Sequence, residues 1–121
     1  MIQRSVRVLG TYYSIEIKKY DEDPDFKEKS LEGWCDDVTK TITLLDMSTA
    51  EGWEREKKSR VQATMRETLR HEIVHAFFSE SGLEASALTY EGAWCKNEEL
   101  VDWIGLQGPK LYRAWREAGA L

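Results

Sequence analysis

The stretch Arg70-His71-Glu72-Ile73-Val74-His75-Ala76-Phe77 contains both histidines of the 121-residue chain. Its pattern is His-Glu-x-x-His, and on an α-helix this spacing places the two imidazoles on one face, one turn apart. Two ring nitrogens placed in this way can bind one zinc ion, and Glu72 lies within reach of a water on that ion. We therefore predict that His71 and His75 are metal ligands and that Glu72 is a catalytic base.

The residues around this motif predict a long helix. Ser59-Arg60-Val61-Gln62 fits a capping box, in which the serine side chain accepts from a free backbone amide and the glutamine reaches back. Ser81-Gly82 predicts the end of the helix, because glycine readily adopts the left-handed conformation found there. Val74 and Phe78 make the C-terminal end apolar nearly all round, as expected of a central, buried helix. The apolar residues that recur on one face are Val61, Met65, Leu69, Ile73, Ala76 and Phe77.

The region before this helix predicts a small β-sheet. Apolar residues, many of them β-branched or aromatic, alternate with polar ones over residues 4–9 and 12–18, and the phase of the alternation changes near Gly10. Residues 34–35 and 40–45 predict two further strands, joined by a polar turn. We expect a mainly antiparallel sheet of three or four strands.

After the long helix, a connection over residues 83–95 is expected to lead into two more helices. Asn97 can cap a helix that runs through Gln107. Gly108-Pro109 predicts the end of that helix, and Pro109 suits the first turn of a short last helix over residues 110–118. The buried side of the Asn97 helix is predicted to contain Leu100, Val101, Trp103 and Ile104. The chain as a whole predicts an α+β fold in one domain, residues 1–121.

Two histidines do not complete a catalytic zinc site, which has three protein ligands and one open position. Because no histidine remains, the third ligand must be Cys, Asp or Glu. We predict Glu98, since Asp102 follows four residues later on the same helical face. Glu98 would bind Zn²⁺ while Asp102 accepts the outer N–H of a zinc-bound histidine. The alternatives are that Cys95 is the third ligand, or that Glu98 and Asp102 are ordinary solvent-facing acids.

Together, the segments His71 to His75 and Asn97 to Asp102 resemble the gluzincin metallopeptidases of the thermolysin clan. The pattern of that clan is His-Glu-x-x-His on one helix and Asn-Glu-x-x-x-Asp on the next. The chain is also similar to the minigluzincins, the minimal members of the clan, and to small zinc-peptidase-like proteins of bacterial and phage genomes. The resemblance implies a minimal zincin-like fold, with a short sheet packed on an active-site helix and a glutamate helix.

The same resemblance implies a zinc-dependent peptidase that hydrolyses a peptide or protein substrate by metal-activated water. It makes residues 40–45 the edge strand that pairs with an extended peptide. Larger members of the clan add a histidine that stabilises the oxyanion, and this chain has none to spare. Tyr90 is the candidate to replace it, because a tyrosine in this interval often shares that task.

Two other functions remain open at this point. A chain that keeps the metal site without turnover would be a zinc-binding scaffold or regulatory module of the same fold. Glu32-Gly33-Trp34-Cys35 also resembles the Glu-Gly-Cys element of peptide deformylases, although the cysteine is displaced by one residue.

Composition argues against several other classes of protein. Hydrophobic residues make up 41% of the chain and charged residues 32%, as in soluble globular proteins. The net charge of −5 argues against a nucleic-acid partner. The sequence has neither a membrane-length apolar stretch nor the apolar run of a signal peptide near its start, so we expect a cytoplasmic protein without a membrane partner, with Cys35 and Cys95 as thiols. Oligomeric state is not predicted, although five tryptophans leave room for an apolar contact patch.

Overall fold

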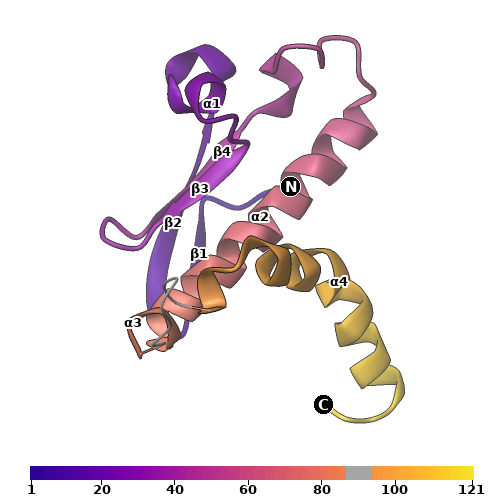
Figure 1. Ribbon diagram of the computed structural model, residues 1–121. Helices are drawn as coiled ribbons and strands as arrows, with labels where there is room; N and C mark the ends of the chain where they lie inside the picture. The colour runs from indigo at the N-terminus through magenta and orange to yellow at the C-terminus, as the bar shows by residue number, and fades with distance from the viewer. Residues whose placement is uncertain (87–93) are drawn as a thin grey trace.

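The computed structural model describes residues 1–86 and 94–121 and has an α+β architecture (Figure 1). Its four-stranded sheet has the order β1-β2-β4-β3. The strands are β1 (Ser5–Val8), β2 (Thr11–Lys18), β3 (Gly33–Asp36) and β4 (Thr41–Leu45). The pairs β1–β2 and β3–β4 are antiparallel, and β2–β4 is parallel. The prediction of an α+β chain with a small sheet is confirmed, and the sheet is mixed.

The change in alternation near Gly10 corresponds to a two-residue turn between β1 and β2. Leu9 has a φ of 47° and Gly10 a φ of 90°, and Val8 pairs with Thr11 across them. A turn of this kind needs positive φ at both central residues, and its twist matches that of the flanking strands. The predicted division of this region into two strands is therefore confirmed.

The prediction that residues 40–45 form the edge strand is wrong. Strand β4 lies between β2 and β3, and its last four residues, Ile42 to Leu45, are all buried. A run buried on both faces is typical of an interior strand, whereas a half-exposed strand alternates. The edge strand on this side of the sheet is β3, which corresponds to the strand predicted over residues 34–35 and is joined to β4 by a turn.

The long helix α2 (Lys58–Glu80) packs against the sheet through Val61, Met65 and Ala76, all of them buried. It begins at Lys58, one residue before Ser59. Its N-cap is Lys57, which makes no side-chain cap bond, so the predicted capping box is wrong. Ser59 already lies inside the first turn, where its hydroxyl no longer has the geometry of a cap. The predicted end is confirmed, with Gly82 at a φ of 83°.

The C-terminal end of α2 is less enclosed than predicted, because 41% of Phe77 is exposed. Glu80 instead anchors this end to the sheet through hydrogen bonds. Its carboxylate accepts from Lys40 Nζ at 2.6 Å, Tyr13 Oη at 2.7 Å and Thr11 Oγ1 at 3.0 Å. Because the donors come from β2 and from the turn before β4, α2 has a fixed position over the sheet.

The last helix, α4 (Glu98–Glu117), is continuous and contains Pro109, so the predicted break and the separate helix over 110–118 are wrong. Figure 1 shows its first half crossing α2 and its second half bending away. The Asn97 cap is confirmed, because Asn97 Oδ1 accepts from the amide of Leu100 at 3.0 Å. Val101 is fully buried as predicted, whereas 53% of Trp103 is exposed.

The remaining elements are short and connect these parts. They are the 3₁₀ turns η1 (Tyr20–Glu22), η2 (Met47–Thr49) and η3 (Trp94–Lys96), and the one-turn helices α1 (Asp25–Glu28) and α3 (Leu83–Ser86). Among the helices described here, none combines the length and apolar character needed to cross a membrane.

Candidate metal centre

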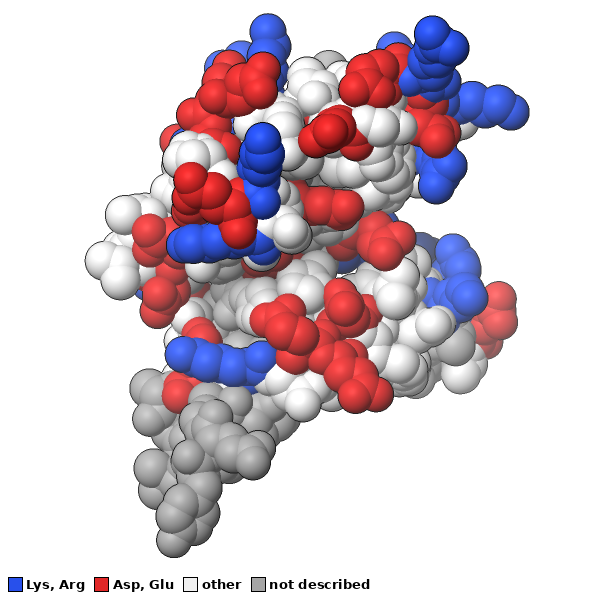
Figure 2. Space-filling model, turned by 45° about the horizontal axis from the view of Figure 1, so that its top comes forward, with Lys and Arg blue, Asp and Glu red and all other residues white. Residues whose placement is uncertain are grey.

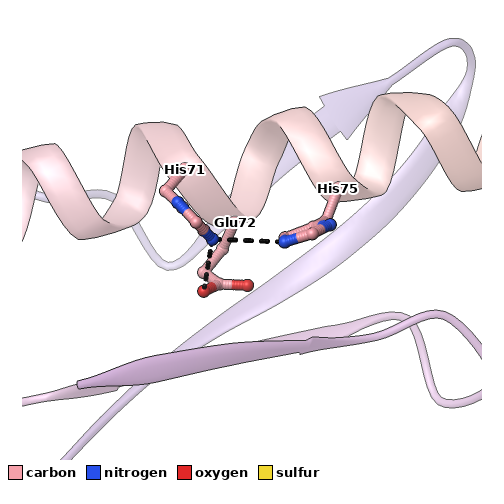
Figure 3. A group of neighbouring side chains, drawn as sticks. All are labelled: His71, Glu72 and His75. Carbon is pink, nitrogen blue, oxygen red and sulfur yellow. Dashed lines mark hydrogen bonds and ion pairs between the residues drawn. The ribbon is translucent and has the colours of Figure 1, made fainter. Parts of the chain in front are cut away.

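Helix α2 presents His71, Glu72 and His75 together, as the helical spacing predicts. Figure 3 shows the three side chains on the side of α2 that faces strands of the sheet. The Nε2 atoms of His71 and His75 are 3.2 Å apart, and one ligand atom from each of the three residues lies within 4.8 Å of the others. Both imidazoles are mostly buried, so their positions are set by packing rather than by solvent.

Helix α4 brings a second carboxylate, that of Glu98, to this group. Glu98 Oε2 lies 3.0 Å from His71 Nε2, and Glu98 Oε1 lies 3.2 Å from His75 Nε2. Glu72 Oε1 is farther from His71 Nε2, at 3.8 Å. Of the two carboxylates, Glu98 is therefore the one that meets both imidazoles, although 67% of its side chain is exposed.

Asp102 lies one turn after Glu98 and contacts the other nitrogen of His71. The distance from His71 Nδ1 to Asp102 Oδ1 is 2.6 Å. If Nδ1 carries the proton and donates to this carboxylate, Nε2 is left with a lone pair. That lone pair then faces the carboxylate of Glu98, and two acceptors at such short range need a proton or a cation between them. Asp102 thus prepares His71 to accept a positive ion.

The donor set and its spacing fit zinc. Zinc binds imidazole nitrogen and carboxylate oxygen at about 2.0–2.2 Å in a tetrahedral arrangement, which separates neighbouring ligand atoms by roughly 3.4 Å. The separations of 3.0 to 3.2 Å among His71, His75 and Glu98 are close to that value. A slight outward adjustment of the exposed Glu98 would complete the spacing. The fourth position would remain for water.

A glycine on α4 allows the two helices to approach this closely. A Cβ atom added to Gly105 would lie 3.3 Å from both the Cα and the backbone nitrogen of His71. Gly105 follows Asp102 by three residues and Glu98 by seven, so all three share the side of α4 that faces α2. Sequence reasoning missed Gly105, although its spacing from the two acids is a signal that could have identified it.

Burial shifts the pKa values of Glu72 and His75 in opposite directions. Only 6% of Glu72 is exposed, and this burial raises the pKa of its carboxyl group to about 7. The nearby charge of His71 opposes that rise, whereas those of Glu98 and Asp102 add to it. Burial also lowers the pKa of His75, which favours the neutral imidazole that binds metals. Glu72 is thus a base with a pKa near neutrality.

These groups lie at the junction of two adjoining parts of one groove. One part has a volume of about 440 Å³ and is bordered by residues 33–35 of the edge strand β3. The other, of about 300 Å³, contains Thr68 and Asp102. His71, Glu72 and Glu98 line both. The face of the molecule in Figure 2 is hollowed across its middle, with acidic side chains on both sides of the hollow.

The two cysteines do not join the metal-ligand group in the part of the chain that the structure describes. Cys95 is fully buried in η3, outside the lining of the groove. Cys35 lines the groove, but burial and then the charge of Glu72 raise the pKa of its thiol to about 12. Because Cys35 does not belong to the metal-ligand group of the described residues, the structure does not favour the deformylase-like alternative. Tyr90, the candidate oxyanion donor, lies outside the described residues.

Comparisons with models of protein families, with curated proteins and with solved structures returned no match to this chain.

Proposed function

We propose that this protein is a zinc-dependent peptidase of the gluzincin type, with a minimal zincin-like fold. In this proposal His71, His75 and Glu98 hold the metal, and Glu72 is the catalytic base. One observation carries it: a carboxylate from α4 lies 3.0 and 3.2 Å from two imidazoles on α2. Three ligands of the types that zinc prefers converge from two helices, beside a buried carboxyl group whose pKa is raised.

Each residue has a separate task in the reaction. When bound, zinc supplies a Lewis acid that lowers the pKa of a coordinated water to about 7. Glu72 accepts the proton of the attacking water and then delivers it to the leaving amine. Asp102 holds His71 in the tautomer that leaves Nε2 free. The packing of α2 on the sheet keeps Glu72 out of bulk water.

The substrate that fits this groove is an extended peptide. Strand β3 is at the edge of the sheet, and three of its four residues border the groove. An edge strand offers backbone groups that can pair with a peptide lying beside it. A bound peptide would then pass the junction where Glu72 and the three ligands meet. This role belongs to β3, because β4 is interior.

The charge of the groove favours peptides with basic side chains. Glu32 and Glu67 line the half that contains Asp102, and this half has no Lys or Arg among its described lining residues. The other half contains Lys96 together with Asp37 and Glu84. Acidic peptides would meet repulsion from both walls of the Asp102 half.

A cleavage screen with matched peptides tests this preference. Peptides with lysine at varied positions should be cleaved several-fold faster than the same peptides with glutamate, and added salt should reduce the difference. Glu67→Gln should reduce the difference in cleavage rate between the lysine and glutamate peptides more than Glu117→Gln does, because Glu117 does not line the groove. Equal cleavage of the lysine and glutamate series would contradict the preference.

Replacing Glu72 tests the reaction itself. Glu72→Gln keeps the shape of the side chain and removes the base, so hydrolysis of a mixed-peptide library should fall by about 10²–10⁴-fold. Bound zinc, measured by metal analysis, should stay at one ion per chain. Glu99→Gln is the matched control, because it removes one charge from α4 at an exposed residue outside the groove lining. Cleavage by Glu72→Gln at the wild-type rate would exclude this mechanism.

The alternative function is a zinc-binding scaffold or regulatory module without turnover. The exposure of Glu98 favours it, because an open ligand leaves a metal site accessible to a partner's side chain. Zinc content does not separate the two functions. Wild-type protein that binds zinc but cleaves no peptide in the screen would support the scaffold, whereas hydrolysis that depends on Glu72 would support the peptidase.

A further inference from the structure

Arg70, the residue before the first candidate ligand, makes a hydrogen bond to the backbone of α4. Its Nε donates to the carbonyl oxygen of Gly105 at 2.8 Å, and the bond is partly buried. Within residues 1–86 and 94–121, no carboxylate lies within 4.0 Å of its side-chain nitrogens. A long cationic side chain is therefore aimed at a single carbonyl inside a helix.

The carbonyl of Gly105 lacks its usual donor within the helix, because residue 109 is a proline. In an α-helix, the carbonyl of residue 105 accepts from the amide of residue 109. Proline has no amide hydrogen, and its ring crowds the carbonyl four residues earlier, which bends the helix. The N–H of Arg70 takes the place of the missing donor. The bend in α4 and the bond from Arg70 thus have one cause.

The same carbonyl belongs to the glycine that packs on His71. The approach is so close that a Cβ on Gly105 would lie 3.3 Å from the backbone of His71. Seven residues before it is Glu98, which meets both imidazoles. A bond that holds Gly105 to Arg70 therefore fixes the part of α4 that carries Glu98 and Asp102.

We propose that Arg70, Gly105 and Pro109 form a latch that sets the position of Glu98 at the metal site, with Arg70 as a positioning residue. This inference rests on the metal site of the proposed function but not on its hydrolytic activity. Pro109 frees the carbonyl, Gly105 presents it at the helix crossing, and Arg70 closes the contact. Without the Arg70 bond, Glu98 would lie on a helix end held less firmly to α2.

The first test measures the latch in metal-free protein by a double-mutant cycle of Arg70→Ala and Pro109→Ala. Alanine at position 109 restores an amide that can donate to Gly105, so the two changes are coupled. Arg70→Ala should lower the midpoint of urea unfolding in the wild-type background and change it much less in the Pro109→Ala background. Arg66→Ala is the matched control, an exposed arginine one turn earlier on α2.

The second test measures the effect on the metal. Zinc affinity should fall about tenfold or more in Arg70→Ala, stay near wild type in Arg66→Ala, and recover to within about threefold when Pro109→Ala is added to Arg70→Ala. Arg70→Lys should not rescue it, because a lysine ammonium lacks the fixed Nε geometry. With saturating Co²⁺, the visible absorption spectrum of Arg70→Ala should differ from that of wild type, because water would replace the Glu98 carboxylate in part of the sites.

The outcomes separate this inference from the proposed function. Additive stability changes in the cycle, or equal zinc affinities in Arg70→Ala and Arg66→Ala, would overturn the latch. An unchanged Co²⁺ spectrum in Arg70→Ala would also overturn its role in placing Glu98. Loss of hydrolysis in Glu72→Gln leaves the latch unaffected, and a wild-type protein that cleaves nothing but shows these metal effects would support the latch alone.

Discussion

The helices α2 and α4 contribute to the candidate site in unequal ways. Helix α2 packs into the two core clusters through buried residues near its start and near its end, and it is anchored at Glu80. His71 and His75 are therefore held in place by the core. Helix α4 supplies Glu98, which is mostly exposed, and its second half bends away from α2 (Figure 1). One half of the site is thus a consequence of the fold, whereas the other depends on a few contacts at a helix crossing.

The strongest test of this comparison removes one candidate ligand from each helix. His75→Ala should lower zinc affinity by about a thousandfold, because no nearby donor replaces a mostly buried imidazole. Glu98→Ala should cost less, about a hundredfold, because water can occupy an exposed position. Competition with a chelator of known affinity measures both. If the loss in Glu98→Ala equals that in His75→Ala, the two helices contribute equally and the comparison fails.

A smaller effect on zinc affinity is expected from adding a side chain at the point where α2 and α4 cross. Gly105→Ala places a Cβ 3.3 Å from His71 backbone atoms, which cannot rotate away, so α4 must shift outward by a few tenths of an ångström. Zinc affinity should fall about tenfold, although alanine favours the helix. Gly108→Ala is the control, since its Cβ would meet no atom within 4 Å and should leave affinity unchanged. Similar zinc affinities in the two variants would show that the helix crossing tolerates a wider gap.

The smallest effect on the site is expected from Glu80, which acts on the stability of α2. Hydrogen bonds, first from Lys40 and then from Tyr13, lower the pKa of Glu80 below its usual value of 4.5. Because the folded pKa is lowered, the stabilisation is present above pH 4.5 and is lost as pH falls through the folded pKa. Glu80→Gln should therefore lower the melting temperature at pH 7, and the difference should shrink by pH 3.

Zinc affinity at pH 7 should change little in Glu80→Gln, because the candidate ligands lie one turn or more away along α2. Glu117→Gln, at the exposed end of α4, is the control for loss of charge. A difference from wild type that stays constant between pH 7 and pH 3 would mean that Glu80 stabilises α2 by packing rather than by its charge.

Local sequence signals account for the parts of the fold that involve one segment at a time. The alternation and Gly10 predict β1, β2 and the turn between them, and Gly82 predicts the end of α2. The wrong predictions come from two different causes. The cap predicted at Ser59 is wrong because the helix begins at the neighbouring residue Lys58. The helix end predicted at Pro109 is wrong because Arg70, which is distant in sequence, supplies the missing hydrogen-bond donor.

The sequence by itself determined the pairing of His71 and His75, because four residues along a helix fix which side chains share a face. It also determined the cap at Asn97, which again involves neighbours in the chain. Only the tertiary structure decided that β4 is interior and that Glu98 lies next to both imidazoles. It also decided that Gly105 lies where α4 approaches the backbone of α2 closely. Local backbone geometry follows from residue spacing, but the approach of separate elements depends on packing that no single segment encodes.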